Sequence, residues 1–238
     1  MKRISRKWGT NRVKLVFRGK TKDVYENPDG TYALKLKDDA TGRDGVFDPG
    51  ENTVGLSIAG LGRESLRLTR YYFEKLTKAG VPTHFIACDL DAVTMQVKPA
   101  KIFGKGLEFI CRAVADGSFV RRYGAYVEPG QDLDYLVEVT LKDDDRGDPL
   151  ITKDALTQLG ILSTADYETC HTLTRTITKR IAEDLAVKGL KLHDIKFEFG
   201  RSEDGEIMLI DEISGGCMRV YKDGTAVAPM ELTKYILA

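Results

Sequence analysis

Alternating hydrophobic and polar positions predict a β-rich first half of the chain. The alternation has a period of two, which places successive side chains on opposite faces of a strand. It covers residues 13–17, 24–25, 31–36, 84–88 and 93–98. Apolar residues at helical spacing predict one amphipathic helix over residues 63–79, which Gly80 and Pro82 end.

A long segment between these elements shows no hydrophobic period. Residues 38–62 are rich in Gly, Asp and Thr. Loops of this length inside compact domains are usually functional or disordered. We therefore expect a long irregular loop there, either functional or disordered.

The second half of the chain combines strands with two helices and ends in a hairpin. Strands are expected at residues 107–114 and 137–141. Thr152 is the expected N-cap of a short helix, and Ser163 that of a longer one with an apolar face. Asp204-Gly205 is a turn sequence between two hydrophobic runs, so the strands around it should pair antiparallel.

The predicted hairpin carries an unusual number of charged residues. Asp194, Lys196 and Glu198 fall on one face of its first strand, and Asp211 and Glu212 follow its second. Carboxylates this close repel each other unless a cation lies between them, and Mg²⁺ carrying nucleotide phosphates is suited to that position. A solvated polar face on an amphipathic hairpin is the alternative.

Two lysines near the N-terminus form a second candidate site in the sequence RGKTKDVY. Lys20 and Lys22 point to the same side of an extended segment, and Gly19 permits a tight backbone before them. Two ammonium groups at this spacing could hold a polyphosphate. The Walker sequence GxxxxGK[ST] is absent, and an ordinary surface turn remains the alternative.

A third cluster, in RAVADGSFVRRYG, is rich in arginine. Arg112, Ser118, Arg121 and Arg122 surround a turn at Gly117, in a segment expected to be a loop. Guanidinium groups bind phosphate or carboxylate through two parallel hydrogen bonds. The cluster therefore indicates an anion-binding site, unless these are ordinary surface arginines.

The acidic sequence KDDDRGDP follows the strand at residues 137–141. Asp148 stands at the end of this run, just before a proline. A carboxylate in that position could join a metal site. An acidic run is also commonly just solvated, and the residues alone leave both readings open.

Composition limits the partners of the protein. The 238 residues contain 36 Lys and Arg against 36 Asp and Glu, so no overall basic field favours nucleic acid. No run approaches the roughly 20 apolar residues of a membrane span, and the basic residues 1–12 lack the apolar region of a signal peptide. Four scattered cysteines indicate reduced thiols, so we expect a cytoplasmic protein without nucleic-acid or membrane partners, with a homo-oligomer left open.

Seven motifs occur together in the order and spacing of a known family. They are RGKTKDVY, DDATGRDG, EKLTKAGVPTHF, RAVADGSFVRRYG, KDDDRGDP, DIKFEFG and LIDEIS. The chain thereby resembles SAICAR synthetase over residues 13–221, nearly its whole length. The resemblance implies an ATP-dependent ligase of purine biosynthesis that joins L-aspartate to the carboxylate of carboxyaminoimidazole ribonucleotide.

The resemblance also implies a fold and a set of roles. The fold is α+β in two lobes with ATP in the cleft: a small β-rich N-terminal lobe, here residues 1–103, and a larger α+β lobe, here residues 104–238. The lysines match phosphate-binding groups, two hairpin carboxylates match Mg²⁺ ligands, and the arginines with Ser118 match contacts to the ribonucleotide. The implied sets are Lys20, Lys22, Glu198 and Asp211 for ATP; Glu198, Asp211 and Asp148 for Mg²⁺; Arg112, Ser118 and Arg219 for the substrate; and Asp194 and Lys196 for catalysis, with Asp194 a possible base.

The chain departs from the family pattern mainly on the substrate side. Ala113 replaces an Asn, Asp116 is a gained acid, Gly216 replaces an Asp that faces the substrate, and Leu61 replaces a Lys. A tail motif of the family is also missing before Ala238. Two alternatives therefore stay open: a paralogous ligase for another heteroaromatic or nucleotide carboxylate, and a nucleotide-binding protein without ligase activity.

Overall fold

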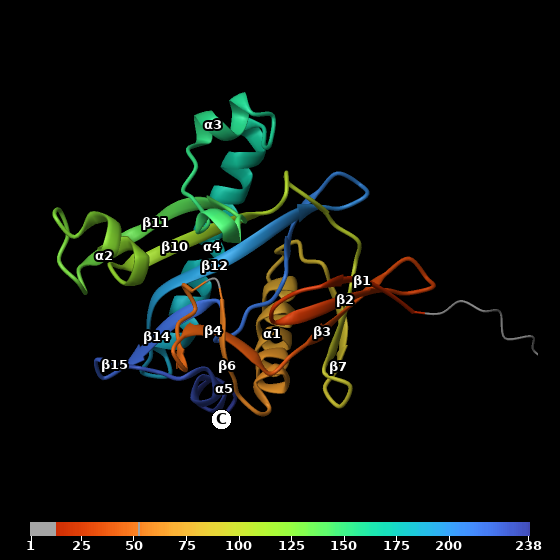
Figure 1. Ribbon diagram of the computed structural model, residues 1–238, viewed down its shortest axis with the longest axis horizontal. Helices are drawn as coiled ribbons and strands as arrows, with labels where there is room; N and C mark the ends of the chain where they lie inside the picture. Colours follow the sequence, from red (N-terminus) through yellow and green to blue (C-terminus); the bar gives the residue numbers. More distant parts are fainter. Residues whose placement is uncertain (1–12, 52) are drawn as a thin grey trace, which may run out of the picture.

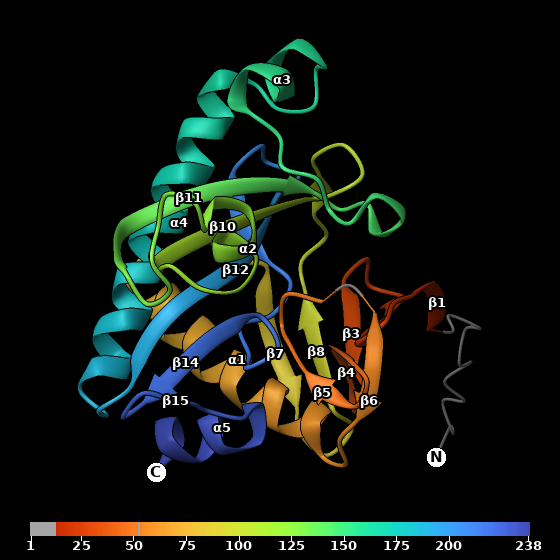
Figure 2. The same cartoon turned by 60° about the vertical axis from the view of Figure 1, so that its left-hand side comes forward.

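The protein has a mixed α+β fold with two lobes (Figure 1). The computed structural model describes residues 13–51 and 53–238; the basic stretch at 1–12, where no signal peptide is expected, lies outside the described residues. Strands of the N-terminal lobe lie on one side of the molecule and the longer C-terminal strands on the other (Figure 2). The predicted α+β, two-lobed architecture is confirmed.

Five antiparallel strands form the sheet of the N-terminal lobe. Its order is β1-β2-β3-β8-β7. The strands are β1 (Lys14–Arg18), β2 (Lys22–Glu26), β3 (Tyr32–Leu36), β7 (Phe85–Asp89) and β8 (Thr94–Val97). Its buried side chains, among them Leu34, Leu36 and Met95, pack against Leu66 of the first helix. The alternating pattern thus located every strand of this sheet.

The segment expected to be an irregular loop is instead a small antiparallel sheet, so that expectation was wrong. Its strands are β4 (Asp39–Arg43), β5 (Val46–Phe47) and β6 (Val54–Ser57). A Cβ on Gly42 would lie 2.1 Å from the oxygen of Val46, and one on Gly55 would lie 2.4 Å from Gly42. The close pairing requires glycine, and glycine removes the side-chain alternation that reveals a strand.

The C-terminal sheet has seven strands and is built around the long strand β12. Its strands are β9 (Lys101–Ile102), β10 (Leu107–Val114), β11 (Asp132–Leu141), β12 (Lys191–Arg201), β13 (Ile207–Ile210), β14 (Met218–Lys222) and β15 (Thr225–Ala226). The order is β11-β10-β12-β14-β15, and β13 and β9 also pair with β12. The predicted hairpin is the antiparallel pair β12–β13, which opposes Glu198 and Ile210.

In the described part of the chain, five helices pack on and beside the sheets. They are α1 (Leu61–Lys78), α2 (Gly117–Tyr123), α3 (Lys153–Gln158), α4 (Thr164–Ala186) and α5 (Pro229–Leu237), with a 3₁₀ turn η1 (Asp144–Arg146). Thr152 and Ser163 cap α3 and α4 as predicted, each accepting a backbone N–H. The arginine-rich segment contains helix α2, which Asp116 caps, where a loop was expected.

One large core joins the C-terminal sheet to α4 and α1. Phe109 and Phe197 of the sheet are buried with Ile177 of α4 and with Leu68 and Phe73 of α1. Helix α1 therefore packs against both sheets and holds the two lobes together. The division of the chain at residue 103 stays a prediction.

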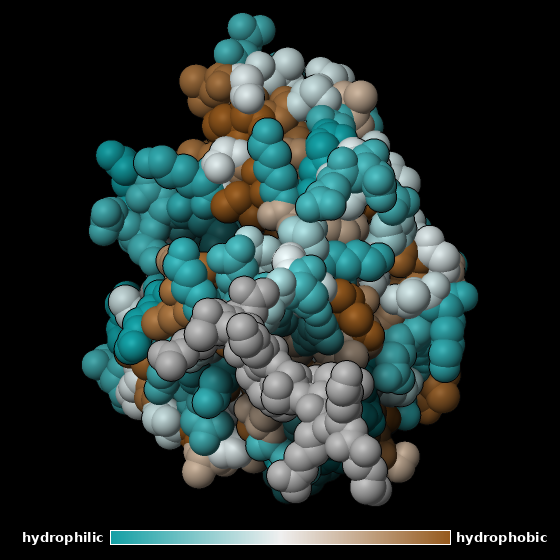
Figure 3. Space-filling model, turned by 90° about the vertical axis from the view of Figure 1, so that its right-hand side faces the viewer, coloured by the Kyte–Doolittle hydropathy of each residue, from teal (hydrophilic) through white to brown (hydrophobic). Residues whose placement is uncertain are grey.

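The face of the molecule on the right-hand side of Figure 1 shows mostly hydrophilic side chains, with separate apolar areas (Figure 3). Among the described residues, no helix is both long and apolar enough to cross a membrane.

Candidate functional site

All ten predicted site residues line one cavity between the two sheets. Its volume is about 860 Å³. The strands of the N-terminal lobe form one wall, and β10, β11 and β12 form the other. The ten residues are Lys20, Lys22, Arg112, Ser118, Asp148, Asp194, Lys196, Glu198, Asp211 and Arg219. The structure thus joins clusters that lie up to about 200 positions apart in the sequence.

The polar wall of this cavity follows from strand geometry. Side chains alternate between the faces of β10, β11 and β12, so polar residues on one face share a surface while the apolar ones pack on the core. The antiparallel register sets Arg112 beside Asp194 and Glu108 beside Thr140. A charged surface is therefore built on rigid strands.

At one end of the cavity, Lys22 joins the two lobes. Its Nζ lies 2.5 Å from Oδ1 of Asp211 and 2.9 Å from Oε1 of Glu212. Asp211 has a left-handed backbone, with φ of 70°, a conformation that Asp adopts more readily than most residues. Lys22 therefore lies against the carboxylates that follow the hairpin.

Two further lysines surround Glu198. Nζ of Lys142 lies 2.8 Å from Oε1 of Glu198, and Nζ of Lys196 lies 3.6 Å from the same oxygen. Lys196 also donates a hydrogen bond of 3.0 Å to Glu108. Three ammonium groups and four carboxylates therefore meet in a small, largely buried volume.

Burial and charge act against each other on these groups. Burial opposes the charged form of Lys22, yet Asp211 and Glu212 outweigh it and raise the pKa of this lysine. Burial favours the neutral form of Asp211, but Lys22 and the neighbouring lysines hold the pKa of this carboxyl below its usual range. Burial and then the charge of Asp211 raise the pKa of Glu198. The two carboxylates are thus close enough to repel each other, as expected of groups that share a cation.

Lys20 and Asp148 lie near the mouth of the cavity. Nζ of Lys20 lies 2.5 Å from Oδ1 of Asp144, and both side chains are substantially exposed. Asp148 accepts a hydrogen bond of 2.7 Å from the backbone N–H of Asp143, and burial raises the pKa of its carboxyl. Its side chain is therefore tied to its own loop.

Residues 13–51 and 53–238 contain no preassembled group of three His, Cys, Asp or Glu side chains that could hold a metal ion. The carboxylates of Glu198 and Asp211 are instead paired with lysines. The predicted metal roles of these two residues and of Asp148 stay predictions.

Arg112 lies at the other end of the cavity and is almost completely buried. Its Nε donates to Glu138 at 2.6 Å, one Nη donates to Asp194 at 3.1 Å, and the other donates to Ser118 at 3.0 Å. Arg122 binds the same oxygen of Glu138 at 2.6 Å. Carboxylates of the protein thus fix the planes of these guanidinium groups.

Arg219 completes this end and lies between two aspartates. Its Nη1 donates to both oxygens of Asp194 at 3.1 and 3.0 Å, and its Nη2 donates to Asp48 at 2.6 Å. Burial raises the pKa of Asp194, and the guanidinium groups of Arg219 and Arg112 offset part of that effect. A Cβ on Gly117 would lie 2.7 Å from the guanidinium carbon of Arg219, so the helix start packs directly on it.

Sequence reasoning missed three carboxylates of the site. Glu108 and Glu138 are polar positions in strands that were correctly predicted, and the alternation could have placed them on the same face of the sheet as Arg112. Asp48 reaches Arg219 from the segment between β5 and β6. That segment has no hydrophobic period, so the sequence contains no signal for this contact.

One histidine is buried beside the site, and the four cysteines form no disulfide. His84 is buried and its Nε2 lies 3.1 Å from the backbone oxygen of Asp211; burial lowers its pKa to about 4. The four cysteines Cys88, Cys111, Cys170 and Cys217 are free thiols.

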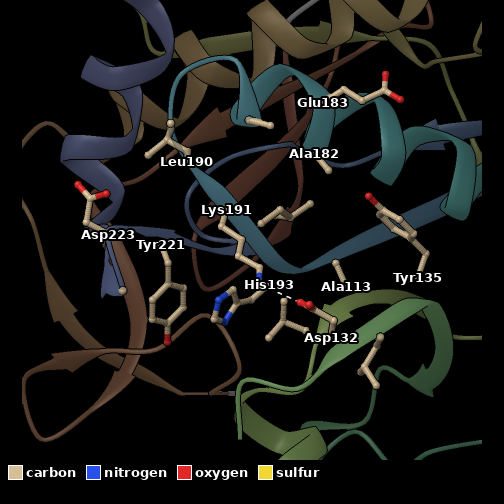
Figure 4. A pocket seen from close by; sticks show the side chains of 16 residues that line it. Ala113, Asp132, Tyr135, Ala182, Glu183, Leu190, Lys191, His193, Tyr221 and Asp223 are labelled. Carbon is tan, nitrogen blue, oxygen red and sulfur yellow. Dashed lines mark hydrogen bonds and ion pairs between the residues drawn. The ribbon is translucent and has the colours of Figure 1, made fainter.

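A second cavity, of about 810 Å³, contains none of the predicted site residues. His193 and Tyr221 lie side by side in its wall, their rings stacked with centroids 3.8 Å apart (Figure 4). Lys191 points from β12 toward Asp132 and binds it at 2.8 Å. This cavity lacks the concentration of lysines and buried carboxylates found between the lobes.

Comparison with known proteins gives a consistent result. A family model described as SAICAR synthetase matches residues 15–235. A phosphoribosylaminoimidazole-succinocarboxamide synthase from Clostridium tetani (strain Massachusetts / E88) is 57% identical over 226 residues, covering 94% of this chain and 100% of the relative.

Two solved structures also match this chain. The first is a SAICAR synthetase with 32% identity and a TM-score of 0.77, and the match covers 93% of this chain and 91% of that chain. The second is a SAICAR synthetase (Type-2) in complex with ADP, with 26% identity and a TM-score of 0.81, and the match covers 95% of this chain and 96% of that chain.

Proposed function

The chain belongs to the SAICAR synthetase family, and we propose that it joins L-aspartate to carboxyaminoimidazole ribonucleotide in this cavity. The protein is an ATP-dependent carbon–nitrogen ligase of purine biosynthesis, and the products are SAICAR, ADP and phosphate. One observation supports this function above the others: a single cavity holds lysines and buried carboxylates at one end and guanidinium groups at the other.

The reaction explains why both ends are needed. A carboxylate is a poor acyl donor because its leaving group would be oxide. Transfer of the γ-phosphoryl group of ATP to a carboxylate oxygen releases ADP and forms an acyl phosphate. The amine nitrogen of aspartate then attacks the carbonyl carbon, the bond to the phosphorylated oxygen breaks, phosphate leaves, and the nitrogen loses its proton.

The lysine end of the cavity fits ATP. Phosphoryl transfer depends on positioning and on neutralising negative charge rather than on covalent help from the protein. Lys22, Lys142 and Lys196 bring three positive charges to one end, and Lys20 stands at the mouth. The ADP carried by a related structure supports nucleotide binding here.

The carboxylates Glu198 and Asp211 fit Mg²⁺. They are buried, they repel each other, and oxygen ligands are those that Mg²⁺ prefers. We propose that these two residues hold the ion, with Asp148 nearby. Bound there, Mg²⁺ would neutralise phosphate charge.

The guanidinium end fits the anionic substrates. Arg112, Ser118 and Arg219 would contact the ribonucleotide. Asp194 was considered as a base, but it is bonded to both arginines, so we propose that it positions them. Lys196 lies between Glu108 and Glu198. It stays the candidate catalytic residue beside the reacting groups.

The alternative functions are less well supported. The 57% identity with a synthase of this name extends over 94% of the chain, which favours the same substrates over those of a paralogue. A nucleotide-binding protein would not require the guanidinium end. We also propose a cytoplasmic location and lobes that divide near residue 103; self-association stays a prediction.

Release of ADP by the purified protein tests the proposed function. We expect ADP only when ATP, Mg²⁺, carboxyaminoimidazole ribonucleotide and L-aspartate are all present. Release with another carboxylate or amine, but not with this pair, would identify a paralogue. No release with any combination in a panel would favour a nucleotide-binding protein.

A further inference from the structure

The guanidinium groups at the substrate end are already bound to carboxylates of the protein. Arg112 contacts Glu138 and Asp194, Arg122 contacts Glu138, and Arg219 contacts Asp194 and Asp48. An anionic group of a substrate that binds one of these arginines must therefore displace a carboxylate or approach it closely. Like charges forced together without a cation between them are unfavourable.

The three carboxylates differ in how easily they can leave. Side-chain exposure is 5% for Asp194 and 8% for Glu138, but 31% for Asp48. Asp194 and Glu138 are held within long strands, and each contacts two arginines. Separating a buried carboxylate from its partners leaves a charge without water, which is costly; Asp48 can exchange its partner for solvent.

Asp48 also has a second partner that does not depend on Arg219. Its Oδ1 accepts a hydrogen bond of 2.8 Å from the backbone N–H of Gly50. A Cβ on Gly50 would lie 2.4 Å from Nη2 of Arg219, so the segment rests directly on the guanidinium group. Asp48 therefore occupies Nη2 of Arg219, while Asp194 occupies Nη1.

We propose that Asp48 is a specificity-determining residue that occupies the substrate-oxyanion position on Arg219 and is displaced when substrate binds. The inference rests on the proposed function. The oxyanion is either the phosphate of the ribonucleotide or a carboxylate of aspartate. Asp48 sets the affinity for that group, because binding requires the loss of one ion pair for each one gained.

Steady-state kinetics of Asp48→Asn test this inference. Asn keeps the shape and can still accept the bond from Gly50, but it lacks the competing charge. We expect the KM for one of the two anionic substrates to fall by about threefold to tenfold, the range expected for losing one partly exposed ion pair. The substrate whose KM falls identifies the oxyanion, and the KM for ATP should not change.

Glu51→Gln is the matched control. Glu51 lies on the same segment and in the same cavity lining, but its carboxylate pairs with Arg43 at 3.4 Å. The substitution Glu51→Gln removes the same charge without touching Arg219, so the KM values for both anionic substrates should stay as in the wild type. An equal fall in this variant would overturn the inference, since it would show only a general field effect.

Other outcomes also decide the question. An unchanged or raised KM for both anionic substrates in Asp48→Asn would show that Asp48 positions Arg219 instead. If Asp48→Asn unfolds, Asp48→Ser replaces it, with the same expected fall. Wild-type turnover of the two substrates is measured first, so failure of the proposed function is recognised separately.

Discussion

Single side chains of the nucleotide end depend on one another for their charge. Lys22 stays an ammonium in a buried position because Asp211 and Glu212 stabilise it, and Asp211 stays a carboxylate because of Lys22. Groups that are matched in this way are sensitive to the loss of one partner. Substitutions that preserve shape but remove charge are therefore the most informative.

Lys22→Met should reduce ADP release by about 100-fold or more, because one preorganised positive charge at the transferring phosphate is lost. The melting temperature should also fall, since two carboxylates lose their partner. Lys35→Met is the matched control: Lys35 is an exposed lysine on the neighbouring strand β3 and should leave turnover unchanged. Turnover of Lys22→Met at the wild-type rate would remove Lys22 from the phosphate site.

Asp211→Asn should abolish turnover while the protein stays folded. Asn tolerates the left-handed backbone at this position about as well as Asp, so circular dichroism should not change. The lost charge removes one of the two proposed Mg²⁺ ligands. An Asn variant that keeps its ADP release and its dependence on Mg²⁺ would exclude Asp211 from the metal site.

At the scale of elements, helix α2 is fixed to the sheet by the residue that caps it. Asp116 accepts the backbone N–H of Gly117 at 2.6 Å, and its Oδ2 lies 2.9 Å from Nδ1 of His193. The hydrogen bond with His193, together with that from Tyr221, holds the pKa of Asp116 well below its usual range. The acid gained at this position thus has a structural partner on β12.

The stabilisation by Asp116 should depend on pH. Its folded-state pKa is depressed below the ordinary value of 3.8, so the stabilisation is complete above that value and is lost as pH falls below it. Urea denaturation should show a deficit of Asp116→Asn relative to the wild type at pH 6 that becomes smaller below pH 4. Asn is itself a good N-cap, so the variant isolates the charge. A deficit that is the same at both pH values would contradict this account.

Gly117→Ala tests how α2 is seated on Arg219. The new Cβ would overlap the guanidinium group, and φ at this position is 52°, so we expect the KM for the ribonucleotide to rise by about tenfold or more while the KM for ATP stays unchanged. Gly130→Ala is the control, since φ is 83° but nothing lies within 4 Å. Equal kinetic effects in both variants would mean that backbone strain alone is responsible.

Elements with a regular period were predictable, and those built on close backbone contact were not. The β12–β13 hairpin, with its row of charges, and helix α1 follow from alternation and helical spacing. The sheet β4–β6 was missed because Gly42 and Gly55 replace the side chains that would reveal it. The segment that contains Asp48 likewise has no hydrophobic period to reveal it. The sequence therefore identified both ends of the site but missed part of the substrate end.

At the scale of the whole molecule, long-range ion pairs connect the lobes across the cavity, with one example at each end. Lys22 and Asp211 are 189 positions apart, and Arg219 and Asp48 are 171 apart. One pair lies at the nucleotide end and the other at the substrate end. Because α1 packs against both sheets, the lobes are held in the arrangement that brings the lysines to the carboxylates.

A crystal structure with a non-hydrolysable ATP analogue and Mg²⁺ is the most direct test of that arrangement. The account predicts the phosphates between Lys22 and the pair Glu198 and Asp211, with the ion bound to those two carboxylates. A nucleotide bound outside this cavity, for example beside His193 and Tyr221 in the second one, would contradict it.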